Sequence, residues 1–354
     1  MKQRRPQETQ KITKESSPLE SLKHTLSNSA LLKILTNRAD WDIQKEGTFS
    51  DPKNADLSHT LDDISKEAEK AGMDLGSYIM EELAFKPSSP KEADDIVRVF
   101  IPGLNTPENE SARRTQYYAD QYGQPMAHIH NGTNLDSGLP MSDQIDYVAA
   151  MMVRQKLKDT ELMKTWEKIL QSNFSQAQPK EIHALLYSDG SIGGIRGIEN
   201  FRRNEIERRL AKLPRSQRHT KREAVTKEVE YLLKKYLFVE LHGNASPNLP
   251  VGPQYLIWTD TEDQMTHNKL PFGLGDMGLH GGNKSDTPNA SYVDYDGPFS
   301  GVNAHNLAAG GVHAVTETLK INNVQTTKEL YQKTQNGEPI IMPKNIQGDE
   351  KELW

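Results

Sequence analysis

Residues 182–194, IHALLYSDGSIGG, constrain the fold of this chain more than any other stretch. An apolar run from Ile182 to Leu186 is typical of a buried strand, and it stops at Tyr187-Ser188-Asp189-Gly190 before a glycine-rich segment that is compatible with a helix. The sequence therefore predicts a sharp strand-to-helix turn with Ser188 at its apex. Such a turn exposes a serine hydroxyl at the carboxyl end of a strand and aims the next backbone N–H groups at a developing oxyanion.

Three alternatives stand beside a nucleophilic Ser188. The usual pattern of such turns is G-x-S-x-G, and Leu186 replaces its first glycine, so Ser188 is also compatible with an ordinary turn serine. Asp189 is a second candidate nucleophile, because a carboxylate can also serve at such a turn. Gly190, Gly193, Gly194 and Gly197 could instead cradle a nucleotide phosphate, although their spacing is not G-x-G-x-x-G.

The composition limits the class of protein. A chain of 354 residues suggests one large domain or two modest ones, and a hydrophobic content of 35% predicts that a sizeable part is solvated. The net charge of −6 argues against a general nucleic-acid binder. The sequence has no cysteine, which excludes a disulfide framework, a thiolate metal site and a cysteine nucleophile.

The ends of the chain carry no visible membrane or export signal. The first residues, MKQRRPQETQKITKESS, begin basic but reach no apolar region typical of a signal peptide. No apolar run approaches the roughly 20 residues that a transmembrane helix needs. We expect a soluble protein that is cytoplasmic or exported without a cleaved signal peptide. A bacterial protein delivered by a specialised secretion system fits the polar leader as well as a cytoplasmic protein does.

The chain divides into three predicted parts. Residues 1–90 form a polar extension, in which a flexible tail precedes one or two docking helices within 56–83 and a linker at 86–90. Residues 91–335 form the main domain, and a polar tail follows over 336–354. Within the main domain, residues 271–301 are rich in glycine, aspartate and asparagine, which predicts a long loop over the sheet.

Strands and helices alternate in the main domain. The predicted strands are 96–101, 126–130, 182–187, 237–241 and 255–258, and the predicted helices are 108–122, 142–170, 198–212, 220–236 and 312–321. This alternation predicts an α/β fold with a mostly parallel central sheet and helices on both faces, preceded by the polar, partly helical extension. In such sheets the functional site lies at the carboxyl ends of the strands.

Short polar motifs follow several of these strands. Pro102-Gly103-Leu104-Asn105 follows the first strand, and His130-Asn131-Gly132-Thr133 follows the second. Asp260, Glu262 and Asp263 follow the strand at 255–258, and His305 precedes the last predicted helix. The carboxyl ends of parallel strands share one edge of the sheet, so these groups are expected to converge there.

On these motifs, residues 95–325 resemble the α/β-hydrolase superfamily. The Y-S-D-G-S turn is similar to the H-S-x-G-S elbow of lipase-like members, and P-G-L-N is similar to their H-G-x oxyanion loop, with Pro102 in place of histidine. The family order of nucleophile, acid and histidine implies the triad Ser188, Asp263 and His305, with Asp260 or Glu262 as the alternative acid and His313 as the alternative histidine. The resemblance further implies an oxyanion hole formed by the backbone N–H groups of Asp189 and Leu104.

The resemblance implies a serine hydrolase, lipase-like or esterase-like, that cleaves a small-molecule or lipid carboxylic ester through an acyl-enzyme. Such an enzyme needs no cofactor, and the loop 271–301 would shape its substrate pocket. The alternative is the same fold without catalysis, acting as a binding or interaction module. Leu186 in the elbow and Pro102 in the oxyanion loop favour that alternative.

Other polar residues receive plainer interpretations. His242, His267 and His280 match no compact metal-binding motif and are expected to be surface or loop histidines, so no metal site is predicted. His130 is expected at the edge of the site. A basic stretch is expected to be a solvated helix face, with an anionic partner or lipid headgroup, and hence peripheral membrane contact, as the alternative; it comprises Arg196, Arg202, Arg203, Arg208, Arg209, Arg215, Arg218 and Arg222.

Overall fold

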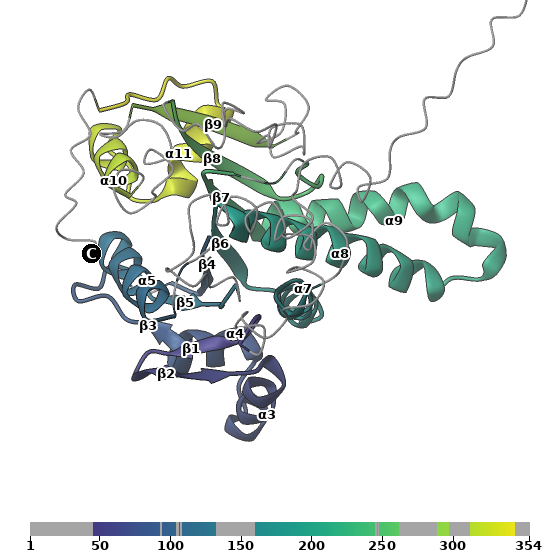
Figure 1. Ribbon diagram of the computed structural model, residues 1–354. Coiled ribbons are helices and arrows are strands. Elements are labelled where there is room, and N and C mark those ends of the chain that lie inside the picture. Colours follow the sequence, from purple (N-terminus) through teal and green to yellow (C-terminus); the bar gives the residue numbers. More distant parts are fainter. Residues whose placement is uncertain are drawn as a thin grey trace, which may run out of the picture.

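A seven-stranded sheet forms the centre of the molecule (Figure 1). The computed structural model describes residues 45–92, 94–103, 106, 108–131, 160–244, 246, 248–261, 289–296 and 312–343. In spatial order the strands are β3 (Ala84–Phe85), β5 (Met126–His128), β4 (Ile96–Ile101), β6 (Glu181–Tyr187), β7 (Leu237–His242), β8 (Gln254–Asp260) and β9 (Ala290–Tyr295). All neighbours pair in parallel except β3, which pairs antiparallel with β5.

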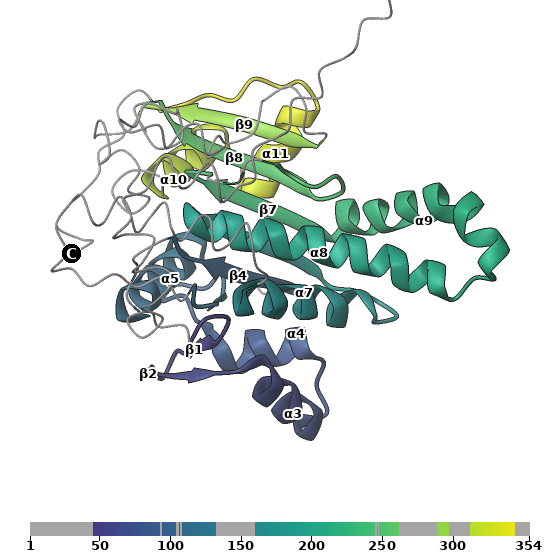
Figure 2. The same cartoon turned by 45° about the vertical axis from the view of Figure 1, so that its right-hand side comes forward.

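Helices cover both faces of this sheet (Figure 2). One face packs against α5 (Glu108–Tyr122), α10 (Val312–Ile321) and α11 (Thr327–Gln335), and the other against α7 (Glu161–Phe174), α8 (Asp189–Ala211) and α9 (Arg215–Tyr236). Neighbouring residues of a strand point to opposite faces, so Leu185 packs with the α5 cluster and Leu186 with the α7–α8 cluster. Burial on both faces explains why the central strands read as continuous apolar runs.

The order of the strands reverses between β4 and β6. From β4 the chain crosses to β5 on one side, and it then returns past β4 to β6 and continues outward through β7, β8 and β9. Because the connections leave β4 and β6 in opposite directions, the carboxyl ends of these strands form a topological switch point, the position at which open α/β sheets bind their ligands. The loop after β4 and the turn after β6 both lie at this position.

The residues before β4 belong to the same core. A two-stranded ribbon of β1 (Phe49–Asp51) and β2 (Asn54–His59) precedes α3 (Leu61–Ala71), α4 (Leu75–Tyr78) and a short π-helix, η1 (Ile79–Leu83). Phe49, Leu61, Ile64 and Ile79 pack in one cluster with Val97 of β4. The helix expected from residue 56 is therefore wrong over its first turn, because Asn54–His59 pairs with β1 and the helix begins only after its N-cap, Thr60.

Most predicted elements of the main domain are confirmed, and the differences have local causes. Thr160 has an extended backbone and caps α7 through its side chain, so the helix expected over 142–170 is not continuous through this residue; residues 142–159 lie outside the described part. Helix α8 begins at Asp189, directly at the turn, rather than near 198. The predicted loop 271–301 contains strand β9, which pairs with β8 in parallel.

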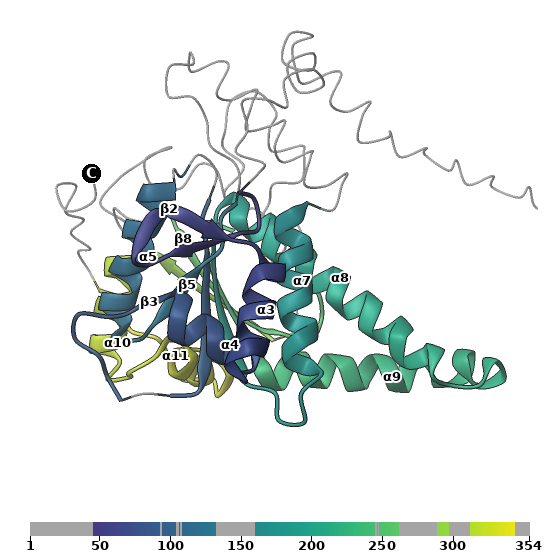
Figure 3. The ribbon, with the colours of Figure 1, turned by 90° about the horizontal axis from the view of Figure 1, so that it is seen from below.

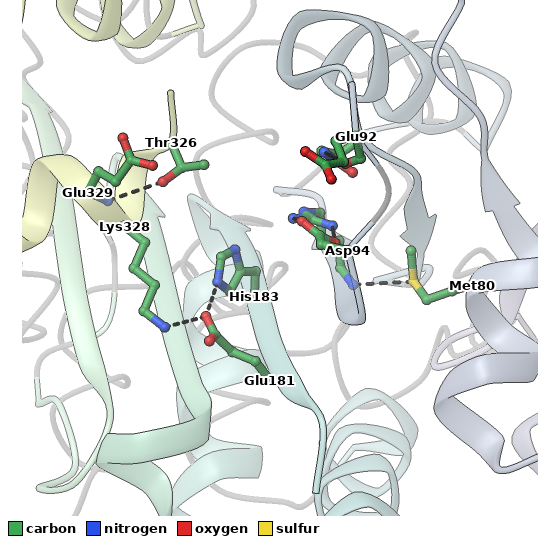
Figure 4. A network of polar contacts seen from close by, with 10 residues as sticks. Met80, Glu92, Asp94, Glu181, His183, Thr326, Lys328 and Glu329 are labelled. Carbon is green, nitrogen blue, oxygen red and sulfur yellow. Dashed lines mark hydrogen bonds and ion pairs between the residues drawn. The ribbon is translucent and has the colours of Figure 1, made fainter. Parts of the chain in front are cut away.

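A polar cluster joins the first residues of β6 to α11 at the amino edge of the sheet (Figure 4). His183 Nε2 and Lys328 Nζ each lie 2.5 Å from Glu181 Oε1. Burial alone would raise the pKa of Glu181, but the hydrogen bonds from His183 and Lys328 and the positive charge of Lys328 outweigh it and lower the pKa to about 2. Ionised Glu181 therefore stabilises the folded state.

This coupling predicts an acid-sensitive contribution to stability. Because the pKa of Glu181 is lower in the folded state than in the unfolded state, ionised Glu181 stabilises the fold at pH values above the unfolded pKa of about 4.5. This contribution is lost as the pH falls toward about 2. We expect Glu181→Gln to lower the free energy of unfolding at pH 7 by about 1–2 kcal/mol, allowing for partial solvent screening. Urea unfolding should show this difference shrink by more than half at about pH 3. A difference that stays constant between the two pH values would contradict this account.

Candidate active site at the carboxyl edge of the sheet

Ser188 lies at the apex of the turn between β6 and α8, in an unusual backbone conformation. Its φ is 50° and its ψ is −123°, a combination that costs a non-glycine residue about 1–3 kcal/mol. The surrounding backbone holds it there: the Ser188 N–H donates to the carbonyl of His242 at 3.0 Å, and the Ser188 carbonyl accepts from Ser191 N at 2.9 Å and from Ser191 Oγ at 2.6 Å. The predicted strand-to-helix turn is confirmed, and strain of this kind is characteristic of functional turns. The expectation that the turn exposes Ser188 is wrong, because the residue is 6% exposed.

The start of α8 lies against the end of β4 at a distance that only glycine permits. A Cβ atom on Gly190 would lie 2.3 Å from the carbonyl oxygen of Pro102 and 2.6 Å from that of Ile101. On the other side of this contact, a Cβ atom on Gly103 would lie 2.9 Å from Ser188 Cβ. Pro102 and Gly103, which follow β4, are therefore packed directly against the serine turn.

The leucine that replaces the first motif glycine is accommodated by a glycine on the helix. A Cβ atom on Gly194 would lie 2.6 Å from Leu186 Cδ1 and 2.8 Å from Cδ2, and the Leu186 side chain is fully buried. In the usual motif the small residue is on the strand, whereas here it is on the facing turn of α8. The departure at Leu186 therefore leaves the close packing of strand and helix intact.

The other glycines of this run also serve packing. They lie inside α8, and a Cβ atom on Gly197 would lie 2.8 Å from the Trp166 ring. Gly190, Gly194 and Gly197 thus let the helix approach β4, β6 and α7, and they do not form an open loop of the kind that cradles phosphate.

Asn131 joins the end of β4 to the serine turn. Its Nδ2 donates to the carbonyl of Pro102 at 3.0 Å and to Asp189 Oδ2 at 3.1 Å, and Asn131 is almost fully buried after β5. Asp189 itself is fully buried, which is unfavourable for the alternative in which its carboxylate attacks a substrate. In the sequence Asn131 belongs to a strand-end motif, but its partners are far away in the chain, so no local pattern indicates its role.

A buried histidine–carboxylate pair lies on the next strand, β7. His242 Nε2 is 2.9 Å from Glu240 Oε1, and Glu240 also accepts from Tyr122 Oη at 3.0 Å and from Thr327 Oγ1 at 2.8 Å. The His242 ring stacks on Trp258 at 6.0 Å between centroids. The expectation that His242 is a surface or loop histidine is wrong, since it ends a strand that is covered on both faces and is 2% exposed.

His128 and His130 are buried as well. His128 Nδ1 lies 2.7 Å from Ser50 Oγ, and burial lowers the pKa of His128 well below its usual range, so this ring is neutral at pH 7. His130 is 2% exposed and directly precedes Asn131.

Two of the remaining residues that the sequence singles out, Asp260 and His313, belong to the described part of the chain. Asp260 is the last residue of β8, 4% exposed, at the same carboxyl edge as Ser188 and two strands away, which corresponds to about 10 Å. His313 belongs to α10. Leu104, Glu262, Asp263, His267, His280 and His305 lie outside the described residues.

The described residues contain no group of three or more His, Asp or Glu side chains that could hold a metal ion. Across the same residues, every helix is too short or too polar to cross a membrane. No family model matches the chain, and neither the curated proteins nor the solved structures contain a match.

The complementary fit of Leu186 and Gly194 predicts a strong energetic coupling. Gly194→Ala alone should destabilise the protein by about 1–3 kcal/mol, because the new methyl group overlaps the Leu186 side chain. In a Leu186→Ala background the same change should be neutral or stabilising, since alanine favours a helix over glycine by about 1 kcal/mol. A double-mutant cycle from urea unfolding measures this coupling, and additive effects would show that the two side-chain positions are independent.

Proposed function

We propose that the protein is a serine hydrolase of the α/β-hydrolase superfamily, lipase-like or esterase-like, which cleaves a carboxylic ester through an acyl-enzyme on Ser188. The observation that carries this proposal is the strained backbone of Ser188 at the carboxyl edge of the sheet, where the strand order reverses. A serine in an ordinary turn does not require such a conformation, whereas a nucleophilic serine between a strand and a helix does.

The proposed reaction follows from these positions. Ser188 Oγ attacks the ester carbonyl carbon and passes its proton to a histidine, which returns it to the departing alcohol; water then repeats the sequence on the acyl-enzyme. The backbone N–H of Asp189, at the start of α8, is one proposed oxyanion donor, and the N–H of Leu104 is the other. A typical donor of this kind contributes about 3 kcal/mol to lowering the barrier.

The contacts around the turn support a preorganised N–H donor at Asp189. Gly103 packs on Ser188, and Asn131 joins the Pro102 carbonyl to the Asp189 side chain, so these residues are held together with the proposed nucleophile. Preorganised donors of this kind are more effective than mobile ones, because they need no reorganisation during the reaction.

His305 and an aspartate complete the proposed triad. Asp260 is the acid that the described residues favour, because it is a buried carboxylate at the carboxyl end of β8, and Asp263 is the second candidate. A separation of two strands from Ser188 leaves room for an imidazole ring between the acid and the nucleophile.

Labelling with a fluorophosphonate probe tests the nucleophile. The wild-type protein should react covalently, and Ser188→Ala should lose the label entirely because no other hydroxyl occupies the elbow. Ser175→Ala, which removes an exposed serine at the end of α7, is the matched control and should label as the wild type does. A folded wild-type protein that does not label would instead favour a non-catalytic binding module.

The acid is tested separately by Asp260→Asn. We expect kcat for a short-chain aryl ester to fall by about 10⁴-fold, with little change in KM, because the histidine loses its orienting carboxylate. Asp296→Asn, an exposed change just after β9 at the same edge, should leave kcat unchanged. If Asp260→Asn retains activity and Asp263→Asn loses it, the acid is Asp263.

A further inference from the structure

Helices α8 and α9 form a hairpin that projects from the body of the molecule (Figures 1 and 3). Helix α8 has 23 residues, about 35 Å, whereas β6 has 7 residues, about 23 Å, so the helix extends past the amino edge of the sheet. Helix α9 then returns to the start of β7 at that edge. Val225 and Val229 of α9 are buried in the same cluster as Ile206 and Leu210 of α8, which holds the hairpin together.

The connection between the two helices carries unpaired positive charge. We call residues 212–221 the hairpin tip; it contains four cationic side chains and no carboxylate, namely Lys212, Arg215, Arg218 and Lys221. The cations on either side are neutralised, since Glu205 binds Arg208 and Arg209 and Glu207 binds Arg222. Within the described part of the chain, none of the four tip cations is in an ion pair. Three are exposed, and Arg218 donates to the carbonyls of Ala211 and Leu213.

The hairpin tip and the rest of the chain have opposite net charge. The whole chain has a net charge of −6, which becomes −10 when the four tip cations are left out. A negatively charged surface would therefore repel the body and attract the tip.

The tip lacks the features that bind proteins or bases. The large hydrophobic residues that are exposed in the described part are Leu57, Tyr231, Val251, Ile321 and Ile341, and none is in the tip. A protein interface usually needs a buried aromatic or aliphatic anchor, and single-stranded nucleic acid needs aromatic rings for stacking. A layer of anionic headgroups needs neither, because the headgroups can rearrange around a convex cluster of four or more cations.

We propose that the hairpin tip binds the anionic phospholipid headgroups of a bilayer. The tip lies beyond the amino edge of the sheet and Ser188 lies at the carboxyl edge, so a protein bound in this way holds its candidate active site away from that bilayer. The tip would serve as an anchor and not as a route for substrate. This proposal stands independently of the proposed ester hydrolysis.

Co-sedimentation of the full chain with vesicles tests the anchor. The protein should pellet with vesicles of phosphatidylcholine that contain phosphatidylserine as about a third of the lipid, and should not pellet with phosphatidylcholine alone. Arg215→Gln combined with Lys221→Gln should weaken this binding by about 30-fold, at about 1 kcal/mol for each lost cation. High salt should weaken the binding of the wild type in the same way.

Lys66→Gln combined with Lys320→Gln removes the same charge from exposed positions on α3 and α10, and this control should bind as the wild type does. Arg215→Lys combined with Lys221→Arg keeps the charge and should also bind. Equal pelleting with both vesicle types, an equal loss in the Lys66 and Lys320 control, or vesicle binding that the tip variant retains would overturn the proposal. Thermal unfolding checks that the variants fold, and Ser188→Ala should bind vesicles normally.

Discussion

The candidate site depends on one close contact between two segments of backbone. The first turn of α8 lies so near the last carbonyl groups of β4 that a side chain at Gly190 would overlap Pro102 and Ile101. This contact sets where α8 begins, and Ser188 must take its strained conformation because β6 ends and α8 starts within one residue. The Ser188 N–H donates to the carbonyl of His242 on the neighbouring strand β7, and Asn131, which follows β5, bonds to Pro102 and to Asp189 on either side of this contact.

The central part of the fold was predictable because it is buried on both sides. Strands β4, β6, β7 and β8 are short apolar runs bounded by turn residues, and the helix at Glu108–Tyr122 has clear boundaries. Strand β9 was not predictable, because Ala290–Tyr295 is an edge strand with an exposed aspartate inside a segment rich in turn-forming residues. The start of α8 was placed too late because glycines argue against a helix, whereas here tight packing requires them.

The site was predictable only in its local part. The Ser188 turn can be predicted from neighbouring residues in the sequence. The contacts of Asn131 span 29 and 58 positions, and no local sequence pattern indicates them. His242 was misjudged for a related reason: its burial depends on Trp258 and Glu240, and hence on the pairing of β7 with its neighbours. Long-range partners of this kind are fixed by the order of strands, which periodicity alone does not determine.

In this turn the strand position carries a large residue, Leu186, and the facing helix position carries a glycine, Gly194. This arrangement affects how such turns are recognised in sequences. The steric requirement is that one of two facing positions, on the strand or one turn into the helix, carries no side chain, and either position can meet it. A search for G-x-S-x-G finds only turns in which the strand position is glycine. It misses chains in which the glycine is at the facing position on the helix. A pattern that also admits a bulky residue two before the serine, with glycine six after it, would detect elbows of this second kind.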